Sequence, residues 1–230
     1  MIQLYYFPTP NTWKVSIMLE ECGLPYAVVP VNIGAGEQFS PQFLAISPNN
    51  KVPAIVDPDG PEGRISIFES GAILVYLAEK TGRFLPAAGA ARAEVLEWLF
   101  WQVGGLGPMA GQAHHFLRFA AEQVPYAIER YTAEVARLYG VLERRLQDRH
   151  WIAGDYSIAD IACWGWISYY EMQGQDLTAF PALERWFRTM AERPAVIRGG
   201  AVGAAQMPSA ASLPEEARRI LSGQGPAAPT

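Results

Sequence analysis

The chain has few cysteines, few histidines and no excess of basic residues, and each shortage excludes a class of function. Cys22 and Cys163 are the only cysteines and lie far apart, which excludes a disulfide-rich scaffold or a cysteine zinc site. The three histidines show no metal-ligand spacing with a carboxylate, so no metal site is expected. Eighteen Lys and Arg against 23 Asp and Glu give a net charge of −5, which argues against a protein that binds nucleic acid through phosphates.

Long apolar runs are also missing. No 18 apolar residues follow one another without interruption, and the chain begins with a strand-like segment rather than a basic region followed by an apolar one. We therefore expect neither a membrane span nor a secretion signal. Because half of the residues are hydrophobic, the chain has enough of them for a substantial core. These features predict an acidic, globular, cytoplasmic protein of one or two domains.

The first eighty residues alternate strand and helix patterns. A first helix begins at Thr12, and Gly23 ends it as a C-terminal cap. The order strand–helix–strand requires a crossover and gives a parallel pair, whereas the later strand–strand–helix gives an antiparallel hairpin covered by a helix. This order predicts a small α+β domain of the thioredoxin-like fold. The strands are expected over residues 2–7, 26–31, 51–57 and 64–68, with the hairpin loop over 57–63 and a second helix over 70–79.

No strand pattern recurs after residue 82, so the remainder is expected to be all-α. We place a thioredoxin-like domain at 1–82, a helical domain at 83–206 and a flexible tail rich in Ala, Pro, Ser and Gly at 207–230. Ser157 and Asp160 have the spacing of a capping box and predict the start of a helix. The other helices are expected over residues 91–119, interrupted by the glycines of 104–108, over 126–146 and over 181–192.

This domain order resembles the cytosolic glutathione transferase superfamily over residues 1–205. The motifs that carry the resemblance are similar to the bacterial Nu-class branch, whose members are glutathione-dependent disulfide reductases. The resemblance implies glutathione as co-substrate, a small-molecule disulfide or electrophile as partner, and a homodimer. The motifs are SPNNKVPAI at 47–55, FESGAI at 68–73, WLFWQVGGLGPM at 98–109 and YAIERY at 126–131.

The turn before the first helix is the candidate catalytic site. Thioredoxins carry Cys-x-x-Cys there, because a helix N-terminus stabilises a thiolate, but this chain has Thr9 and Asn11 and no cysteine. These short donors would hold the thiolate of bound glutathione, which becomes the nucleophile. The alternative is that Thr9 and Asn11 only cap the helix. Tyr5 and Tyr6 are weaker candidates, and strand alternation predicts that one of them faces the core.

Two further motifs fit an extended tripeptide. A cis bond at Val52–Pro53 would free the Val52 backbone to pair with glutathione, although an ordinary proline at a strand start is the alternative. Glu69 and Ser70 open a helix, whose amides and hydroxyl suit a carboxylate while Glu69 suits an ammonium group. A plain N-terminal cap is the alternative for Ser70.

The resemblance also implies roles for Gln38 on the tripeptide backbone, Lys51 on the glycine carboxylate and Arg130 on a glutathione carboxylate. From the residues alone, an equally good interpretation is that Gln38 and Lys51 are solvated loop residues. For Arg130 the simplest interpretation is a surface salt bridge with Glu134 at i+4. Gln112 and His115 are candidates for the cleft between the domains, with packing as the commoner fate.

We therefore expect a glutathione-dependent disulfide reductase or glutathione transferase with its thiolate at Thr9 and Asn11. Two alternatives stay open: transfer of glutathione to carbon electrophiles, and a non-catalytic glutathione-binding or protein-interaction module. The segments 98–101 and 126–128 carry more apolar surface than packing against one small domain needs. This excess favours a two-fold dimer that would bury it.

Overall fold

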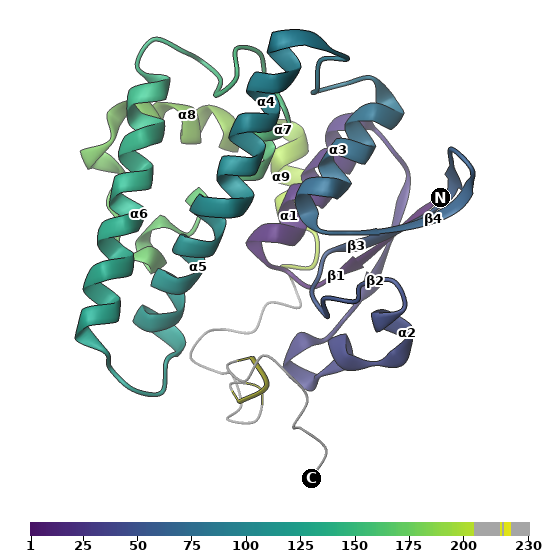
Figure 1. The fold of residues 1–230 in the computed structure, drawn as a ribbon, viewed down its shortest axis with the longest axis horizontal. Helices are drawn as coiled ribbons and strands as arrows, with labels where there is room; N and C mark the ends of the chain where they lie inside the picture. The colour runs from purple at the N-terminus through teal and green to yellow at the C-terminus, as the bar shows by residue number, and fades with distance from the viewer. Residues whose placement is uncertain (205–216, 218, 222–230) are drawn as a thin grey trace.

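A four-stranded mixed sheet forms one side of the molecule, and helices form the other (Figure 1). The computed structural model describes residues 1–204, 217 and 219–221. In the sheet order β2-β1-β3-β4, β1 is parallel to β2 and antiparallel to β3, and β3 is antiparallel to β4. This is the predicted thioredoxin-like arrangement. The strands are β1 (Ile2–Tyr6), β2 (Tyr26–Pro30), β3 (Ala54–Gly60) and β4 (Gly63–Phe68).

Helix α1 (Pro10–Cys22) lies between the sheet domain and the helical domain. It contacts α3 (Ser70–Thr81) on one side and α7 (Ile158–Ile167) and α9 (Pro194–Ala201) on the other. Because α1 is covered on several sides, its polar residues Lys14 and Ser16 are buried along with its apolar ones. A short helix α2 (Pro41–Leu44) and two single turns, Ile33–Ala35 and Glu37–Phe39, connect β2 to β3.

Two glycines allow the helical domain to approach α1 closely. A Cβ at Gly165 of α7 would lie 2.5 Å from the Pro10 carbonyl oxygen, and a Cβ at Gly199 of α9 would lie 2.6 Å from the Ile17 backbone. Any larger residue would push α7 or α9 away from α1. The start of α1 is therefore held directly against α7.

The remaining helices are α4 (Gly89–Trp101), α5 (Gly107–His114), α6 (Pro125–Leu146) and α8 (Pro181–Ala191), with short helical turns at Tyr170–Gln173 and Leu177–Ala179. Ser157 and Asp160 form the predicted capping box of α7, in which Asp160 accepts from the Ser157 amide at 3.0 Å. Asp160 also accepts from the Ile152 amide and the Trp186 indole nitrogen.

The structure differs from several expectations about elements. The glycines of 104–108 do not interrupt the helix, because Gln102–Leu106 forms a π-helical turn that joins α4 to α5. β3 begins at Ala54 rather than at residue 51 and extends to Gly60, so the hairpin loop is shorter than expected. A second π-helical turn, His115–Phe119, extends α5, and α9 was not predicted. The proposed tail at 207–230 lies almost entirely outside the described residues.

Candidate active site

Thr9 is the N-terminal cap of α1. Its hydroxyl accepts from the Thr12 amide at 3.4 Å, while its own amide donates to Thr12 Oγ1 at 2.9 Å, which completes a reciprocal capping box. Thr9 thus caps α1, which is compatible with either interpretation of this residue. Thr12 Oγ1 lies 2.6 Å from the Phe7 carbonyl oxygen and donates to it, so the Thr9 hydroxyl proton is directed to Thr12 Oγ1 or to a ligand.

Asn11 lies one residue inside the start of α1 and is held from the helical domain. Its Oδ1 accepts a hydrogen bond of 2.9 Å from Trp166 Nε1 of α7. An indole nitrogen only donates, so this contact fixes which end of the Asn11 amide faces Trp166. Among the described residues Asn11 Nδ2 has no hydrogen-bond partner, so its two protons are available to an anion at the helix end. No sequence pattern indicates this contact, because the two residues lie 155 positions apart.

The two tyrosines of β1 have other partners. Tyr6 is fully buried and donates to the Val202 carbonyl at 2.8 Å, and burial raises the pKa of its hydroxyl to about 12. Tyr5 packs on Phe43, with ring centroids 6.0 Å apart. The expectation that one of the pair faces the core is confirmed.

The turn between β4 and α3 has the backbone geometry of a ligand site. Glu69 has a φ of +67°, an unfavourable conformation for a residue with a Cβ, and no side chain caps the start of α3. The first amides of α3 and the Ser70 hydroxyl therefore lie at an uncapped helix N-terminus. Glu69 Oε1 accepts from Asn49 Nδ2 at 3.1 Å, which ties this turn to the loop that contains Val52.

The Val52–Pro53 bond is cis, as expected. Among the described residues, the Val52 N–H and C=O have no backbone partner. An extended peptide laid along Val52 would satisfy both groups as an additional strand does.

A buried lysine lies behind the α3 N-terminus and was not anticipated. Lys14 is 1% exposed, and its Nζ donates to Ser70 Oγ at 3.3 Å and to Gln102 Oε1 at 2.6 Å. Burial lowers the pKa of Lys14 to about 7, while Cys163 and the negative charge of Glu69 act in the opposite direction. Gln102 belongs to the π-helical turn, so this network joins the two domains.

Three of the predicted glutathione-binding residues make no side-chain hydrogen bond to Lys14, Glu69 or Ser70 among the residues that the structure describes. Gln38 is buried and donates to the Ile33 carbonyl at 3.1 Å, and Lys51 is exposed without a side-chain partner in the described part of the chain. Arg130 is exposed on α6, and this helix lies at the edge of the helical domain away from the sheet (Figure 1). The expected pair of Arg130 with Glu134 is wrong, because Glu134 pairs with Arg137 at 2.7 Å.

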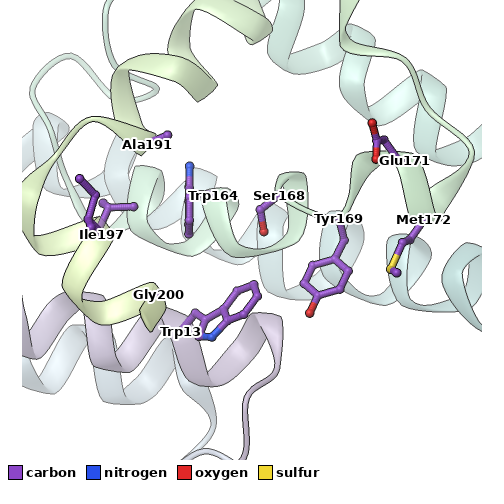
Figure 2. A pocket seen from close by; sticks show the side chains of 10 residues that line it. Trp13, Trp164, Ser168, Tyr169, Glu171, Met172, Ala191, Ile197 and Gly200 are labelled. Atoms are coloured by element: carbon purple, nitrogen blue, oxygen red, sulfur yellow. The ribbon is translucent and has the colours of Figure 1, made fainter. Parts of the chain in front are cut away.

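Aromatic side chains line a cavity of about 540 Å³ between α1, α7 and α9 (Figure 2). Trp13 stacks on Tyr169 with ring centroids 5.4 Å apart, and the ring of His114 lies 5.5 Å from Tyr169. The predicted cleft residue His115 packs instead on Phe116. Burial lowers the pKa of His114 to about 4, so its imidazole is neutral at physiological pH.

Other classes of site are missing from the described residues. No cluster of His, Cys, Asp and Glu suitable for a metal ion occurs among them, and none of their helices is long and apolar enough to cross a membrane. Cys22 and Cys163 are both free thiols, and burial raises the pKa of each.

Two family models match the chain. The glutathione S-transferase N-terminal domain matches residues 9–80, and the glutathione S-transferase C-terminal domain matches residues 107–194. Disulfide-bond oxidoreductase YfcG of Escherichia coli K12 is 54% identical over 198 residues, which cover 85% of this chain and 92% of YfcG. Disulfide-bond oxidoreductase YghU of the same strain is 42% identical, over 86% of this chain and 73% of YghU.

Solved structures show the same fold. A glutathione transferase family member from Pseudomonas fluorescens, crystallised with two glutathiones, superposes with a TM-score of 0.82 at 48% identity, over 86% of this chain and 92% of that one. A glutathione transferase from Pseudomonas putida, with one glutathione disulfide bound per subunit, gives a TM-score of 0.83 at 44% identity, over 87% and 91%. The chain belongs to the glutathione S-transferase family.

Proposed function

We propose that the protein reduces disulfide bonds with glutathione, and that the glutathione thiolate is held at Thr9 and Asn11. The observation that carries the proposal is the Asn11 amide, whose oxygen is occupied by Trp166 and whose Nδ2 donors are left at the N-terminus of α1. A helix N-terminus with free donors lowers the pKa of a thiol placed there. The names of YfcG and YghU support the reaction class.

Bound glutathione would lie extended across the sheet domain. Its cysteine backbone would pair with Val52, next to Pro53. Its γ-glutamyl carboxylate would accept from Ser70 and the first amides of α3, and Glu69 would take its ammonium group. Lys51 is proposed for the glycine carboxylate, and Gln38 for the backbone of the tripeptide. The relatives crystallised with glutathione support this ligand.

The reaction is two successive thiol–disulfide exchanges. The bound thiolate attacks one sulfur of the substrate disulfide, forms a mixed disulfide and releases the other sulfur as a thiolate, which takes a proton. A second glutathione thiolate attacks the glutathione sulfur of the mixed disulfide. This step releases the second substrate thiol and leaves glutathione disulfide. The two glutathiones of the Pseudomonas fluorescens relative and the glutathione disulfide of the Pseudomonas putida relative are consistent with this sequence.

A two-fold homodimer is part of the proposal. Phe100 on α4 is 65% exposed and Tyr126 on α6 is 74% exposed, so both rings are accessible to a second chain. In a dimer, Arg130 would serve the glutathione of the neighbouring chain, since α6 lies far from the site of its own chain. The cytoplasm is the proposed location, because both cysteines are free and the reaction consumes reduced glutathione.

Transfer of glutathione to a carbon electrophile is the second candidate. The cavity lined by Trp13, Trp164 and Tyr169 favours it, since aromatic walls suit an apolar acceptor. Both reactions use the same thiolate, so the cavity alone does not decide between them.

The test compares two acceptors with the same enzyme and the same glutathione concentration. Hydroxyethyl disulfide reports reduction through the glutathione disulfide formed, and a chlorodinitrobenzene reports transfer. We expect faster turnover of the disulfide, and we expect Asn11→Ala to lower both rates in parallel. A protein that binds glutathione but turns over neither acceptor would be a binding module, and the proposed reaction would be wrong.

A further inference from the structure

Lys14 is buried, and no buried carboxylate among the described residues neutralises its ammonium group. Its ammonium group donates to the Ser70 hydroxyl and to the Gln102 side-chain oxygen, both uncharged. Burying an ammonium group is costly, and cores retain one when it interacts with another charge. In the described residues, the nearest acidic group that influences Lys14 is Glu69, which is exposed and already bonded to Asn49.

The place of Lys14 adds to this cost. Ser70 is the first residue of α3, and the N-terminus of a helix carries a partial positive charge. A cation there is repelled by the helix, whereas an anion is attracted by the helix and the cation together. The two positive features therefore make this end of α3 suited to a ligand carboxylate.

The hydrogen bond between Lys14 and Ser70 also fixes the direction of the serine proton. An ammonium group has no acceptor, so Ser70 Oγ must accept from Lys14. The O–H of Ser70 is then left to donate elsewhere. Because Ser70 stands at the uncapped start of α3, a carboxylate bound there is the natural acceptor.

We propose that Lys14 is a positioning residue of the glutathione site: its ammonium group orients the Ser70 hydroxyl toward the γ-glutamyl carboxylate and adds positive charge behind it. This inference rests on the proposed glutathione-binding function. Gln102 has the supporting role of holding Lys14 Nζ from the helical domain, at 2.6 Å.

Protonation of Lys14 should govern this arrangement. A neutral amine accepts a hydrogen bond, so it would draw the Ser70 proton inward and leave the ligand carboxylate without it. Burial lowers the pKa of Lys14 to about 7, and a bound carboxylate would raise it. The other groups that face Lys14 are Glu69 at the start of α3 and the Cys163 thiol on α7, whose pKa is raised by burial and by Asp160. Glutathione affinity should therefore fall as the pH rises through 7 to 8.

The experiment measures calorimetric binding of S-methylglutathione at pH 6 and pH 8. This probe has no thiol, so thiolate formation does not contribute to its pH dependence. The variants are Lys14→Met, which keeps the length of the side chain without its charge, and Gln102→Glu, which places a carboxylate beside Lys14 and should keep it protonated. Arg83→Met is the matched control, because it removes one exposed positive charge just after α3.

We expect Lys14→Met to bind about tenfold more weakly than the parent at pH 6, the effect of losing one hydrogen bond supported by a charge. The difference should shrink at pH 8, where the parent loses affinity and Lys14→Met does not. Gln102→Glu should lose less affinity than the parent between the two pH values. Arg83→Met should follow the parent, because titration of the ligand itself is common to all four proteins.

Equal affinities and equal pH dependence of Lys14→Met and the parent would overturn the positioning role while leaving the glutathione site intact. If Lys14→Met fails to fold, the pH profile of Gln102→Glu decides, and a profile identical to that of the parent would contradict the inference. Failure of the folded parent to bind S-methylglutathione at either pH would overturn the glutathione site and, with it, the role of Lys14.

Discussion

The indole nitrogen of Trp166 lies 2.9 Å from Asn11 Oδ1, and this hydrogen bond joins the helical domain to the first turn of α1. The contact depends on the close packing of α7 on α1, where Gly165 leaves no room for a side chain against Pro10. The helical domain thus orients the Asn11 amide as well as forming part of the cavity wall. The proposed thiolate site is assembled from both domains.

Replacement of Trp166 by Phe should lower disulfide turnover. Without the indole donor, the Asn11 amide is free to rotate and to present its oxygen to the thiolate. We expect kcat/KM to fall about tenfold, which is a smaller loss than complete removal of a hydrogen-bond donor to an anion causes. Steady-state kinetics with hydroxyethyl disulfide measure the change. A folded Trp166→Phe variant with the kinetics of the parent would show that the amide orientation does not matter.

Replacement of Asn11 should separate turnover from binding. Asn11→Ala removes the Nδ2 donors, and we expect the activation free energy of turnover to rise by up to about 3 kcal/mol. The free energy of glutathione binding should change less. Asn11→Asp still accepts from Trp166 but places a negative charge beside the sulfur, so it should raise the pKa of the bound thiol. Ultraviolet absorbance of the thiolate as a function of pH measures this pKa. Unchanged thiolate titration in both variants would move activation to Thr9.

The cysteines of the chain should be dispensable for activity. Cys22 is half-buried and Cys163 is buried in α7, and the pKa of each is raised rather than lowered, which disfavours the nucleophilic thiolate. The double variant Cys22→Ala, Cys163→Ala should keep disulfide reduction, with a stability loss of about 1–2 kcal/mol from the cavity at Cys163. Loss of activity in the folded double variant would refute the use of a borrowed thiol.

Local patterns were sufficient to predict much of the fold. Gly23 ends α1 with a φ of +66°, and the Ser157–Asp160 box starts α7, because both depend on neighbouring residues only. The continuous path from α4 through Gln102–Leu106 into α5 was not predictable in this way. Gly104 and Gly105 have the composition of a break, but the π-helical turn that contains them contacts α6 and α7 and includes the buried residues Gln102 and Leu106.

Site residues were predictable only where their role depends on neighbouring residues in the sequence. Thr9 and Ser70 occupy helix starts, which the sequence marks. Trp166 acts on Asn11 from 155 residues away, and Lys14 reaches Gln102 across 88 residues, so no local pattern indicates either pair. For the pair of Lys14 and Gln102, the available signal was a lysine among the apolar residues of α1.

Asp160 should be important for stability. It is fully buried and accepts from the amides of Ile152 and Ser157 and from the Trp186 indole. Asp160→Ala would leave these donors buried and unpaired, and we expect a loss of about 3 kcal/mol or more. Denaturant unfolding at neutral pH measures the loss. Asp160→Asn keeps one acceptor oxygen and should lose less stability than Asp160→Ala. Equal stability of Asp160→Ala and the parent would contradict this role of Asp160.

Assembly gives the last test, because the proposed role of Arg130 requires a second chain. Arg130 is exposed on α6, away from Thr9 and Asn11 of its own chain, and the exposed ring of Phe100 marks an apolar surface on α4. A two-fold contact would bury this ring and supply Arg130 to the neighbouring site. Sedimentation at micromolar concentration should give twice the chain mass of 25.3 kDa, and Phe100→Asp should shift the equilibrium toward the monomer. If Arg130 acts across the dimer, Phe100→Asp and Arg130→Ala should weaken glutathione binding to a similar degree, and the double variant should be no worse than either alone. A parent protein that stays at 25.3 kDa over a tenfold range of concentration would exclude both the dimer and the role of Arg130.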